Sequence, residues 1–201
     1  GGLSAHNYQL TYVNGILDID KATLDLQAAS DSRTYNGTNT SNGKVTATGL
    51  FGTDKVTGLS QSFDSRNAGS RDLLVNNGYV VDDSNGGLNY AVVTHTASGN
   101  IAKATLDLQA ATDSRTYNGT VASNGTVGVT GLFGTDKVIG LSQSFDSRNA
   151  GSRDLLVSSG YVVDDGNGGN NYDVVTHTAS GNIAKATLDL QAASDKRTYN
   201  A

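Results

Sequence analysis

The feature that most constrains this chain is an internal repeat of 82 residues. The segment KATLDLQA begins at Lys21, again at Lys103 and again at Lys185. Residues 21–102 align with residues 103–184 without a gap, and 70 of the 82 positions are identical. A repeat at a fixed spacing predicts one structural unit copied along the chain, so the fold of the chain reduces to the fold of that unit.

The repeat divides the chain into two complete units and two partial ones. Residues 21–102 are predicted as repeat module 1, and residues 103–184 as repeat module 2. Residues 1–20 align with the end of a repeat, so we interpret them as the C-terminal strands of a preceding repeat. Residues 185–201 align with the start of a repeat and are predicted as the first strands of a following one.

The boundary between the modules carries no Pro-rich or Gly/Ser-rich linker. Between Tyr90 and Ala110 the only candidate break is Ser98-Gly99-Asn100. A flexible linker would need a longer polar stretch. We therefore predict that the modules abut, and that the last strand of one leads directly into the first strand of the next.

Composition and local patterns indicate strands joined by tight turns. The chain has no Pro, and all 19 acidic residues are Asp, while Gly, Ser, Thr and Asn are abundant. These residues favour turns over helices. Short segments with period-two alternation or β-prone composition predict strands at 22–28, 32–35, 44–50, around 56, and at 61–64, 72–75, 78–82 and 90–95. The predicted fold class is all-β, with tandem small β-sandwich (Ig-like) or β-grasp-like modules arranged end to end as an elongated rod; the pattern fits both topologies.

Charge and hydropathy exclude several classes of function. The net charge is −5 and the pI is about 4.9, which argues against nucleic-acid binding because that needs concentrated Lys and Arg. No apolar run approaches the roughly 20 residues that span a bilayer, so no membrane insertion is expected. The chain has no Cys, which removes disulfides and thiolate metal sites.

Several short motifs of module 1 recur in module 2. They are SRTYNGT at 32–38, GTDKV at 52–56, SFDSRNAG at 62–69, Asn89-Tyr90, and the closing Gly99-Asn100-Ile101. With these motifs the modules resemble the YDG repeats, related to MBG-type repeats, of large bacterial filamentous-haemagglutinin-like adhesins. The sequence departs from that pattern in having Asn36 where the name-giving Asp stands and in lacking proline at the module junction.

The resemblance implies structural stalk or extender repeats of a bacterial surface or secreted adhesin. Such repeats would project a binding region and support cell adhesion or biofilm formation, outside a Gram-negative cell and associated with its outer membrane. The implied partners are neighbouring repeats of the same chain, and the fragment is expected to be a monomer. The alternative is a multivalent binding module, with a weak site for host glycan or matrix protein in each repeat and avidity raising the affinity.

An enzyme is not expected, because tandem copies of a catalytic domain this small and this similar would be unusual. His95 could join Ser and Asp residues in a hydrolytic triad, but nothing in the sequence marks the pre-organised pocket that a triad needs. No cofactor is predicted. A turn with an exposed ion pair is the preferred interpretation of Asp54-Lys55, over a buried Lys that forms an isopeptide crosslink.

The acidic loop of each module is a weak candidate for calcium binding. Its possible oxygen ligands are Asp82, Asp83 and Asn85 in module 1 and Asp164, Asp165 and Asn167 in module 2. Ca²⁺ takes six to eight oxygen ligands, and the loop does not match the spacing of an EF-hand. A solvated hairpin turn is therefore the preferred interpretation.

Two further patterns allow either a structural or a functional interpretation. Glycosylation sequons begin at Asn36, Asn39, Asn118 and Asn124, and Asn-Gly-Thr is equally a turn sequence. Four aromatic residues could form a carbohydrate platform, but aromatics at strand positions are usually core: Phe51, Phe63, Tyr79 and Tyr90.

Overall fold

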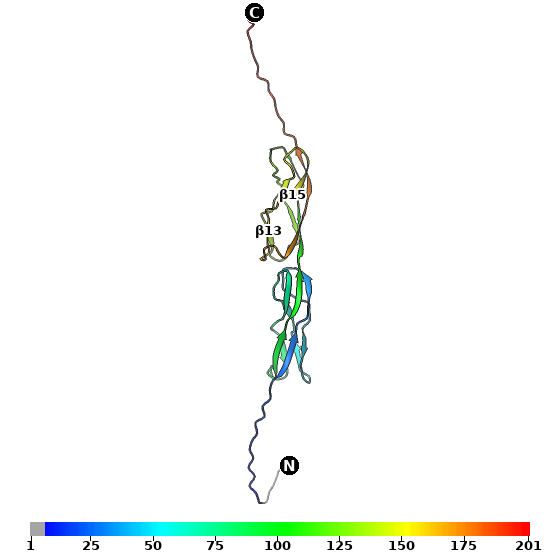
Figure 1. Ribbon diagram of the computed structural model, residues 1–201, viewed down its shortest axis with the longest axis vertical. Helices are drawn as coiled ribbons and strands as arrows, with labels where there is room; N and C mark the ends of the chain where they lie inside the picture. The colour runs from blue at the N-terminus through cyan, green and yellow to red at the C-terminus, as the bar shows by residue number, and fades with distance from the viewer. Residues whose placement is uncertain (1–6) are drawn as a thin grey trace.

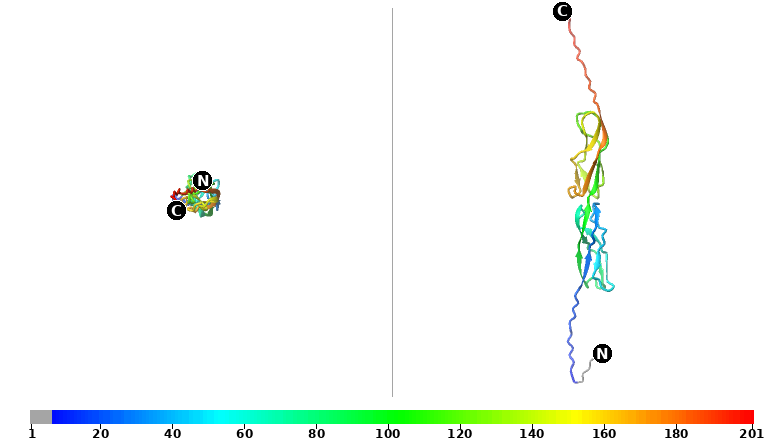
Figure 2. Two further views of the ribbon diagram at one scale, coloured as in Figure 1. Left: turned by 90° about the horizontal axis from the view of Figure 1, so that it is seen from above. Right: turned by 45° about the vertical axis from the view of Figure 1, so that its right-hand side comes forward.

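The computed structural model describes residues 7–201, and these residues form strands and no helix. The strands gather in two groups that follow one another along the longest axis, with an extended segment at each end (Figure 1). The same separation is visible from a second side in Figure 2. The predicted all-β class is confirmed. Because no helix is present in the described residues, none of them could cross a membrane as a helix.

Each group contains nine strands with nearly the same bounds relative to the repeat. The first group consists of β1 (Ala22–Gln27), β2 (Ser32–Thr34), β3 (Thr46–Thr48), β4 (Lys55–Thr57), β5 (Gln61–Phe63), β6 (Gly69–Val75), β7 (Val80–Asp82), β8 (Tyr90–His95) and β9 (Ala97–Ala102). The second consists of β10 (Ala104–Gln109), β11 (Asp113–Thr116), β12 (Gly128–Thr130), β13 (Lys137–Ile139), β14 (Gln143–Phe145), β15 (Gly151–Val157), β16 (Val162–Asp164), β17 (Tyr172–His177) and β18 (Ala179–Ala184).

Three small curled sheets form in each module. In module 1 their strand orders are β3-β1-β8, β2-β9-β6-β5 and β4-β7, and module 2 repeats all three. The pairings β1–β8 and β2–β9 are parallel, and the others are antiparallel. The opening strands of a module therefore lie beside its closing strands. Every strand pairing joins two strands of the same module.

The buried side chains follow the predicted alternation. Leu24 and Leu26 on β1 are fully buried and pack with Tyr90 on β8, while Asp25 between them points away from this cluster. A second cluster begins in the other half of module 1, with Phe63 and Leu73. Each fully buried Leu or Phe side chain stabilises the fold by about 1.5–3 kcal/mol.

The predicted break at Ser98-Gly99-Asn100 is wrong, because these residues lie inside β9 and pair with β2 and β6. Gly99 lets strand β9 pass very close to Asp31 and Phe63. A Cβ atom there would lie 2.6 Å from the carbonyl oxygen of Asp31 and 2.8 Å from the ring of Phe63. Glycine inside a strand often marks such an approach, so this residue does not indicate a turn.

The chain passes from module 1 to module 2 through one residue. Strand β9 ends at Ala102 and β10 begins at Ala104, with only Lys103 between them. The predicted direct passage from strand to strand is confirmed at this boundary. Residues 7–20 and 185–201 contain no strand. In the complete modules the matching residues form strands that pair with other strands of the same module.

Candidate interaction site at the joint between the modules

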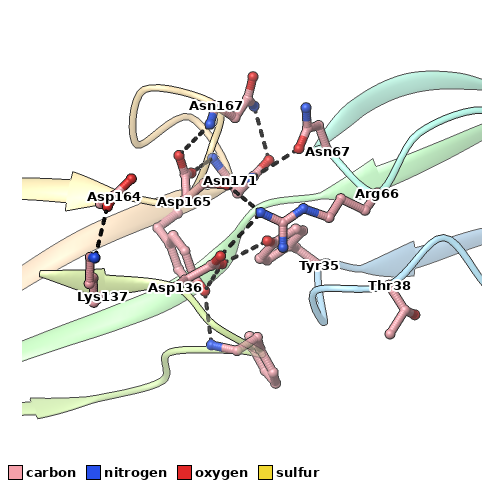
Figure 3. A network of polar contacts seen from close by, with 12 residues as sticks. Tyr35, Thr38, Arg66, Asn67, Asp136, Lys137, Asp164, Asp165, Asn167 and Asn171 are labelled. Atoms are coloured by element: carbon pink, nitrogen blue, oxygen red, sulfur yellow. Dashed lines mark hydrogen bonds and ion pairs between the residues drawn. The ribbon is translucent and has the colours of Figure 1, made fainter.

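The two modules meet in a network of polar and aromatic contacts that we call the joint. Its docking face, at the end of module 1, follows β2 and lies between β5 and β6: Tyr35, Arg66, Asn67 and Ala68. Its receiving face, at the start of module 2, comes from the turn before β13, the loop between β16 and β17, and the first residue of β17: Phe133, Asp136, Asp165, Asn171 and Tyr172. Figure 3 shows the two faces directed toward one another.

The carboxylate of Asp136 is at the centre of the joint. Its Oδ2 accepts hydrogen bonds from the hydroxyl groups of Tyr35, at 2.7 Å, and Tyr172, at 2.8 Å. Its Oδ1 pairs with Arg66 Nη2 at 3.2 Å (Figure 3). The side chain of Asp136 is only 1% exposed. A carboxylate buried to this degree is tolerated when donors and a cation replace the lost water, and module 1 supplies two of these three partners.

Arg66 binds the receiving face at two points. Besides the pair with Asp136, its Nη2 donates to the backbone carbonyl of Asp165 at 2.6 Å. The Arg66 side chain is 34% exposed, so water screens part of its charge. The contact therefore contributes less than a fully buried ion pair would, but it fixes the position of module 1 against two loops of module 2.

The acidic loop of module 2 is shaped by Asp165 and presents Asn171 to module 1. The Asp165 carboxylate accepts from the backbone N–H groups of Asn167, Gly169 and Asn171 at 2.7–3.0 Å. Burial alone would raise the pKa of Asp165, but these donors outweigh it and lower the pKa below its usual value. The fully buried Asn171 then accepts from the Ala68 N–H at 2.9 Å through Oδ1.

Three aromatic rings close the apolar side of the joint. Tyr35 meets Phe133 edge-to-face, with ring centroids 6.2 Å apart, and meets Tyr172 in the same way at 5.4 Å. This geometry is favourable beyond simple burial. Burial, together with the hydrogen bond to Asp136, raises the pKa of Tyr35. Burial also raises the pKa of Tyr172 to about 12, although the N–H that Phe133 donates to its hydroxyl acts against this.

The hydrophobic core continues across the joint. One cluster contains Leu73 and Ile101 of module 1 together with Leu106 and Val163 of module 2, and Tyr35 lies in the same cluster. The outer half of each module has a separate, smaller cluster. The modules are therefore packed against each other through shared core and not through polar contacts alone.

Docking buries Tyr35 and part of Phe133, as the undocked copies of these two residues in the same chain show. Tyr35 is 1% exposed, and its copy Tyr117 at the free end of module 2 is 40% exposed. Phe133 is 37% exposed, against 67% for Phe51 at the free end of module 1. All nine joint residues are identical in the two modules.

The structure gives the calcium candidates of module 1 other partners. The carboxylate of Asp83 accepts from the backbone N–H groups of Asn85, Gly87 and Asn89 at 2.7–3.1 Å. Asp82 pairs with Lys55 at 3.4 Å across β4 and β7.

In module 2, Asp164 pairs with Lys137 at 3.4 Å, and Asp165 and Asn167 form the loop described above. Between residues 7 and 201 no three His or Asp side chains gather as a metal site.

The remaining candidates from the sequence are not among the nine residues of the joint. His95 pairs with Asp25 at 2.8 Å on the exposed surface of the β1–β8 sheet. Asp54 does not pair with its neighbour Lys55; it accepts from the Tyr90 hydroxyl at 2.7 Å. Asn36 is exposed, and its Oδ1 accepts from the N–H and the hydroxyl of Thr38, which closes a turn.

The four aromatic candidates divide between core and surface. Phe63 and Tyr90 are buried in two different core clusters, and Tyr79 is partly buried against the cluster that contains Tyr90. Phe51 is exposed, and it is the module 1 copy of Phe133 in the receiving face. The interpretation as core is therefore confirmed for Phe63 and Tyr90 and wrong for Phe51.

The repeated sequence motifs contain residues of the joint, but the sequence does not show that these residues contact one another across the two modules. Tyr35, Arg66 and Asn171 with its neighbour Tyr172 lie in the repeated motifs, which were interpreted as turns and core. A usable signal was present: identical Arg, Asn and Tyr residues recur in loops, where polar residues are otherwise free to vary.

Strands, sheets and joint together define a chain of repeated all-β modules that dock head to tail. Residues 102–180 match the YDG domain family, and this part of the chain is a YDG-type module. The match begins at the end of β9 and nearly covers module 2. No curated protein and no solved structure gives a significant match to the chain.

Proposed function

We propose that this chain forms structural stalk or extender repeats of a bacterial surface or secreted adhesin of the filamentous-haemagglutinin-like type. Each module is a small β-sandwich, and the modules stack end to end as an elongated rod. The rod projects a binding region away from a Gram-negative cell and supports adhesion or biofilm formation. The partners of each module are its neighbours in the same chain.

The observation that carries this proposal is the joint. Domains of one chain move relative to each other by default unless their interface is well packed. Here bending would withdraw Tyr35 and Arg66 from the buried carboxylate of Asp136 and would divide the shared core cluster. Such a boundary is expected to be stiff, as a stalk requires.

The strand geometry supports extension along one direction. Residues 90–102 form β8 and β9 with only Thr96 between them, and β10 follows after Lys103. A strand advances about 3.3 Å per residue, so this run of 13 residues spans roughly 40 Å. Each module is expected to lengthen the rod by about that amount.

The distance between two spin labels tests the stiffness of the joint. The chain has no Cys, so Val80→Cys and Val162→Cys place one label at the same exposed position of each module. A stiff rod gives one narrow distance distribution near 40 Å. In a matched chain that also carries Tyr35→Ala and Arg66→Ala, the distribution should broaden. A broad distribution in the chain without these two substitutions would contradict the proposal.

Small-angle scattering of a dilute sample tests the overall shape. A single globule of 201 residues has a radius of gyration of about 17 Å. A rod of two modules should give a value well above this. A radius below about 20 Å would show a compact particle and would overturn the end-to-end arrangement.

A further inference from the structure

We propose that this chain modifies itself at two turns, where Asn36 and Asn118 lose their side-chain amide and become aspartate or isoaspartate without an enzyme. Both asparagines stand in the repeated sequence Tyr-Asn-Gly-Thr, directly before Gly37 and Gly119. The turns hold the amide in a setting that promotes this reaction. The stalk proposal does not depend on it, and neither does the reaction depend on the stalk.

The reaction needs only the chain and water. The backbone nitrogen of Gly37 loses its proton to solvent and attacks Cγ of Asn36. As the new N–C bond closes a succinimide ring, the bond from Cγ to the side-chain nitrogen breaks, and this nitrogen takes a proton from water and leaves as ammonia. Water then opens the ring at one of its two carbonyl groups, which gives aspartate or isoaspartate. Glycine favours the ring closure because it has no Cβ to obstruct it.

The chain contains its own comparison set, because the Asn-Gly pair recurs at eight positions. The asparagines of these pairs are Asn14, Asn36, Asn42, Asn77, Asn85, Asn118, Asn124 and Asn167. Within residues 7–201, only Asn36 and Asn118 of this set accept hydrogen bonds at Oδ1. The structure therefore singles out two of eight pairs that look alike in sequence.

The donors at Oδ1 lie where negative charge develops during the attack. The backbone N–H of Thr38 donates to Asn36 Oδ1 at 3.1 Å, and the Thr38 hydroxyl donates to the same atom at 2.9 Å. Thr120 makes the same two contacts with Asn118, at the same two distances. Donors placed in advance at such an oxygen stabilise the transition state more than the neutral amide.

An arginine strengthens both sets of donors. Arg115 Nη1 donates to Asn118 Oδ1 at 2.5 Å. In module 1, Arg33 Nη1 donates to the Thr38 hydroxyl oxygen at 3.1 Å, and this hydroxyl donates to Asn36 Oδ1. A cation that reaches the oxygen directly or through a hydroxyl favours the charged intermediate over the neutral amide.

The attacking nitrogen and the amide are both accessible. Among the described residues, no group accepts a hydrogen bond from the N–H of Gly37 or Gly119. Asn36 is exposed although module 2 is docked beside it, and Asn118 is exposed as well. The setting of the amide is therefore the same kind in a docked and in an undocked module.

The neighbouring pair at Asn42 shows the opposite arrangement. The N–H of Gly43 donates to the Ser41 hydroxyl at 3.1 Å, so the attacking nitrogen is occupied. A Cβ atom on Gly43 would lie 2.2 Å from Gln61 Nε2, which shows how closely this backbone is packed. Module 2 repeats both contacts around Asn124. Asn42 and Asn124 should therefore be protected.

The turn around Asn36 suits the product better than the amide. Donors that converge on an oxygen favour its charged form, so an aspartate at position 36 would keep these contacts and strengthen them. Each conversion adds one negative charge next to Tyr35 or its copy Tyr117. An isoaspartate also adds a carbon atom to the backbone there.

Site-resolved mass spectrometry of the full chain tests the proposal. The chain is incubated at mildly alkaline pH and digested with trypsin at intervals, and fragmentation of the peptides assigns the mass gain to individual asparagines. Asn14 is the internal reference, because it is exposed and lies outside any strand. Asn36 and Asn118 should convert faster than Asn14, and Asn42 and Asn124 more slowly. In concentrated urea all of them should convert at the rate of Asn14.

A conservative variant separates the effect of the donors from that of the sequence. Thr38→Val removes the hydroxyl and keeps the backbone N–H. It should slow conversion of Asn36 by about two- to tenfold, the factor for one ordinary hydrogen bond, while Asn118 in the same molecule keeps its rate. Thr120→Val should do the reverse. If either Asn36 or Asn118 converts no faster than Asn14, or if the valine variants leave both rates unchanged, the proposal is wrong.

Discussion

The hydroxyl group of Tyr35 donates a 2.7 Å hydrogen bond to Asp136, which lies 101 residues further along the chain and in the next module. The same tyrosine recurs as Tyr117, where no neighbouring module covers it and 40% of it is exposed. Each residue of the joint thus occurs once docked and once free. Substitutions in one copy can be measured against the identical substitution in the other.

Tyr35→Phe should lower the free energy of unfolding by about 1.5–3 kcal/mol, because the buried Asp136 carboxylate loses one of its three donors. Urea unfolding of a dilute sample measures this. Tyr117→Phe is the matched control and should change stability by less than about 0.5 kcal/mol. Equal losses in the two variants would show that the tyrosine acts within its own module.

Arg66→Met should uncouple the modules while it keeps the apolar part of the side chain. The pair with Asp136 and the bond to the Asp165 carbonyl are both lost. Because Arg66 is partly exposed, we expect a loss of about 1–2 kcal/mol, less than for a fully buried pair. Thermal unfolding should show this loss for Arg66→Met and almost none for Arg148→Met. A joint without coupling would give the same small change for both.

The folded chain should lose stability at alkaline pH. An unfolded tyrosine has a pKa of about 10, and burial raises the pKa of Tyr172 to about 12 in the folded chain. The folded state therefore holds the proton more tightly. Its stability contribution is complete below pH 10 and is lost as the pH rises through 12.

Unfolding midpoints measured from pH 8 to 12 should fall over this window. The fall should be smaller in Tyr35→Phe, which has one buried phenol fewer. A flat profile up to pH 12 would contradict the burial of these hydroxyl groups.

Gly99→Ala should destabilise module 1 by about 1–3 kcal/mol, the usual cost of overpacking. Its Cβ would collide with the Asp31 carbonyl and with the ring of Phe63. The control is Gly160→Ala, where a Cβ meets no atom within 4 Å and which should be neutral or slightly stabilising. Unfolding in urea compares the two. Similar effects at both positions would mean that strand β9 is not packed as described.

Millimolar calcium should leave the melting temperature unchanged relative to chelator. The oxygens of Asp83 already accept three backbone N–H groups, and Asp82 faces Lys55. A ligand that binds only the folded state would raise the melting temperature. A rise of many degrees would show that calcium replaces these N–H contacts.

Sequence patterns predicted the strands well and the long-range contacts poorly. Alternation identified the buried Leu24 and Leu26 on β1 and Tyr90 on β8, because side chains alternate between the faces of a strand. The pattern gave no information on the parallel pairing of β1 with β8, since period two is the same in parallel and antiparallel sheets. Gly99 was interpreted as a break because glycine in sequence does not distinguish a turn from a close approach of strands.

The contacts of the joint could not be predicted from the sequence for a related reason. Asp136 precedes Lys137, which suggests a local ion pair, yet the carboxylate faces Tyr35 and Arg66 of another module. The partly exposed copy Asp54 has the same neighbours in sequence. Local sequence is thus identical for a buried and a partly exposed carboxylate, and only the placement of the next module distinguishes them.

The passage through the single residue Lys103 has a consequence for how such a protein can change length over generations. Each module presents one kind of surface at its start and a matching kind at its end. Gain or loss of a whole 82-residue unit by recombination between near-identical gene segments would therefore bring together two surfaces that already fit. Length could vary between descendants in steps of one unit without any compensating mutation.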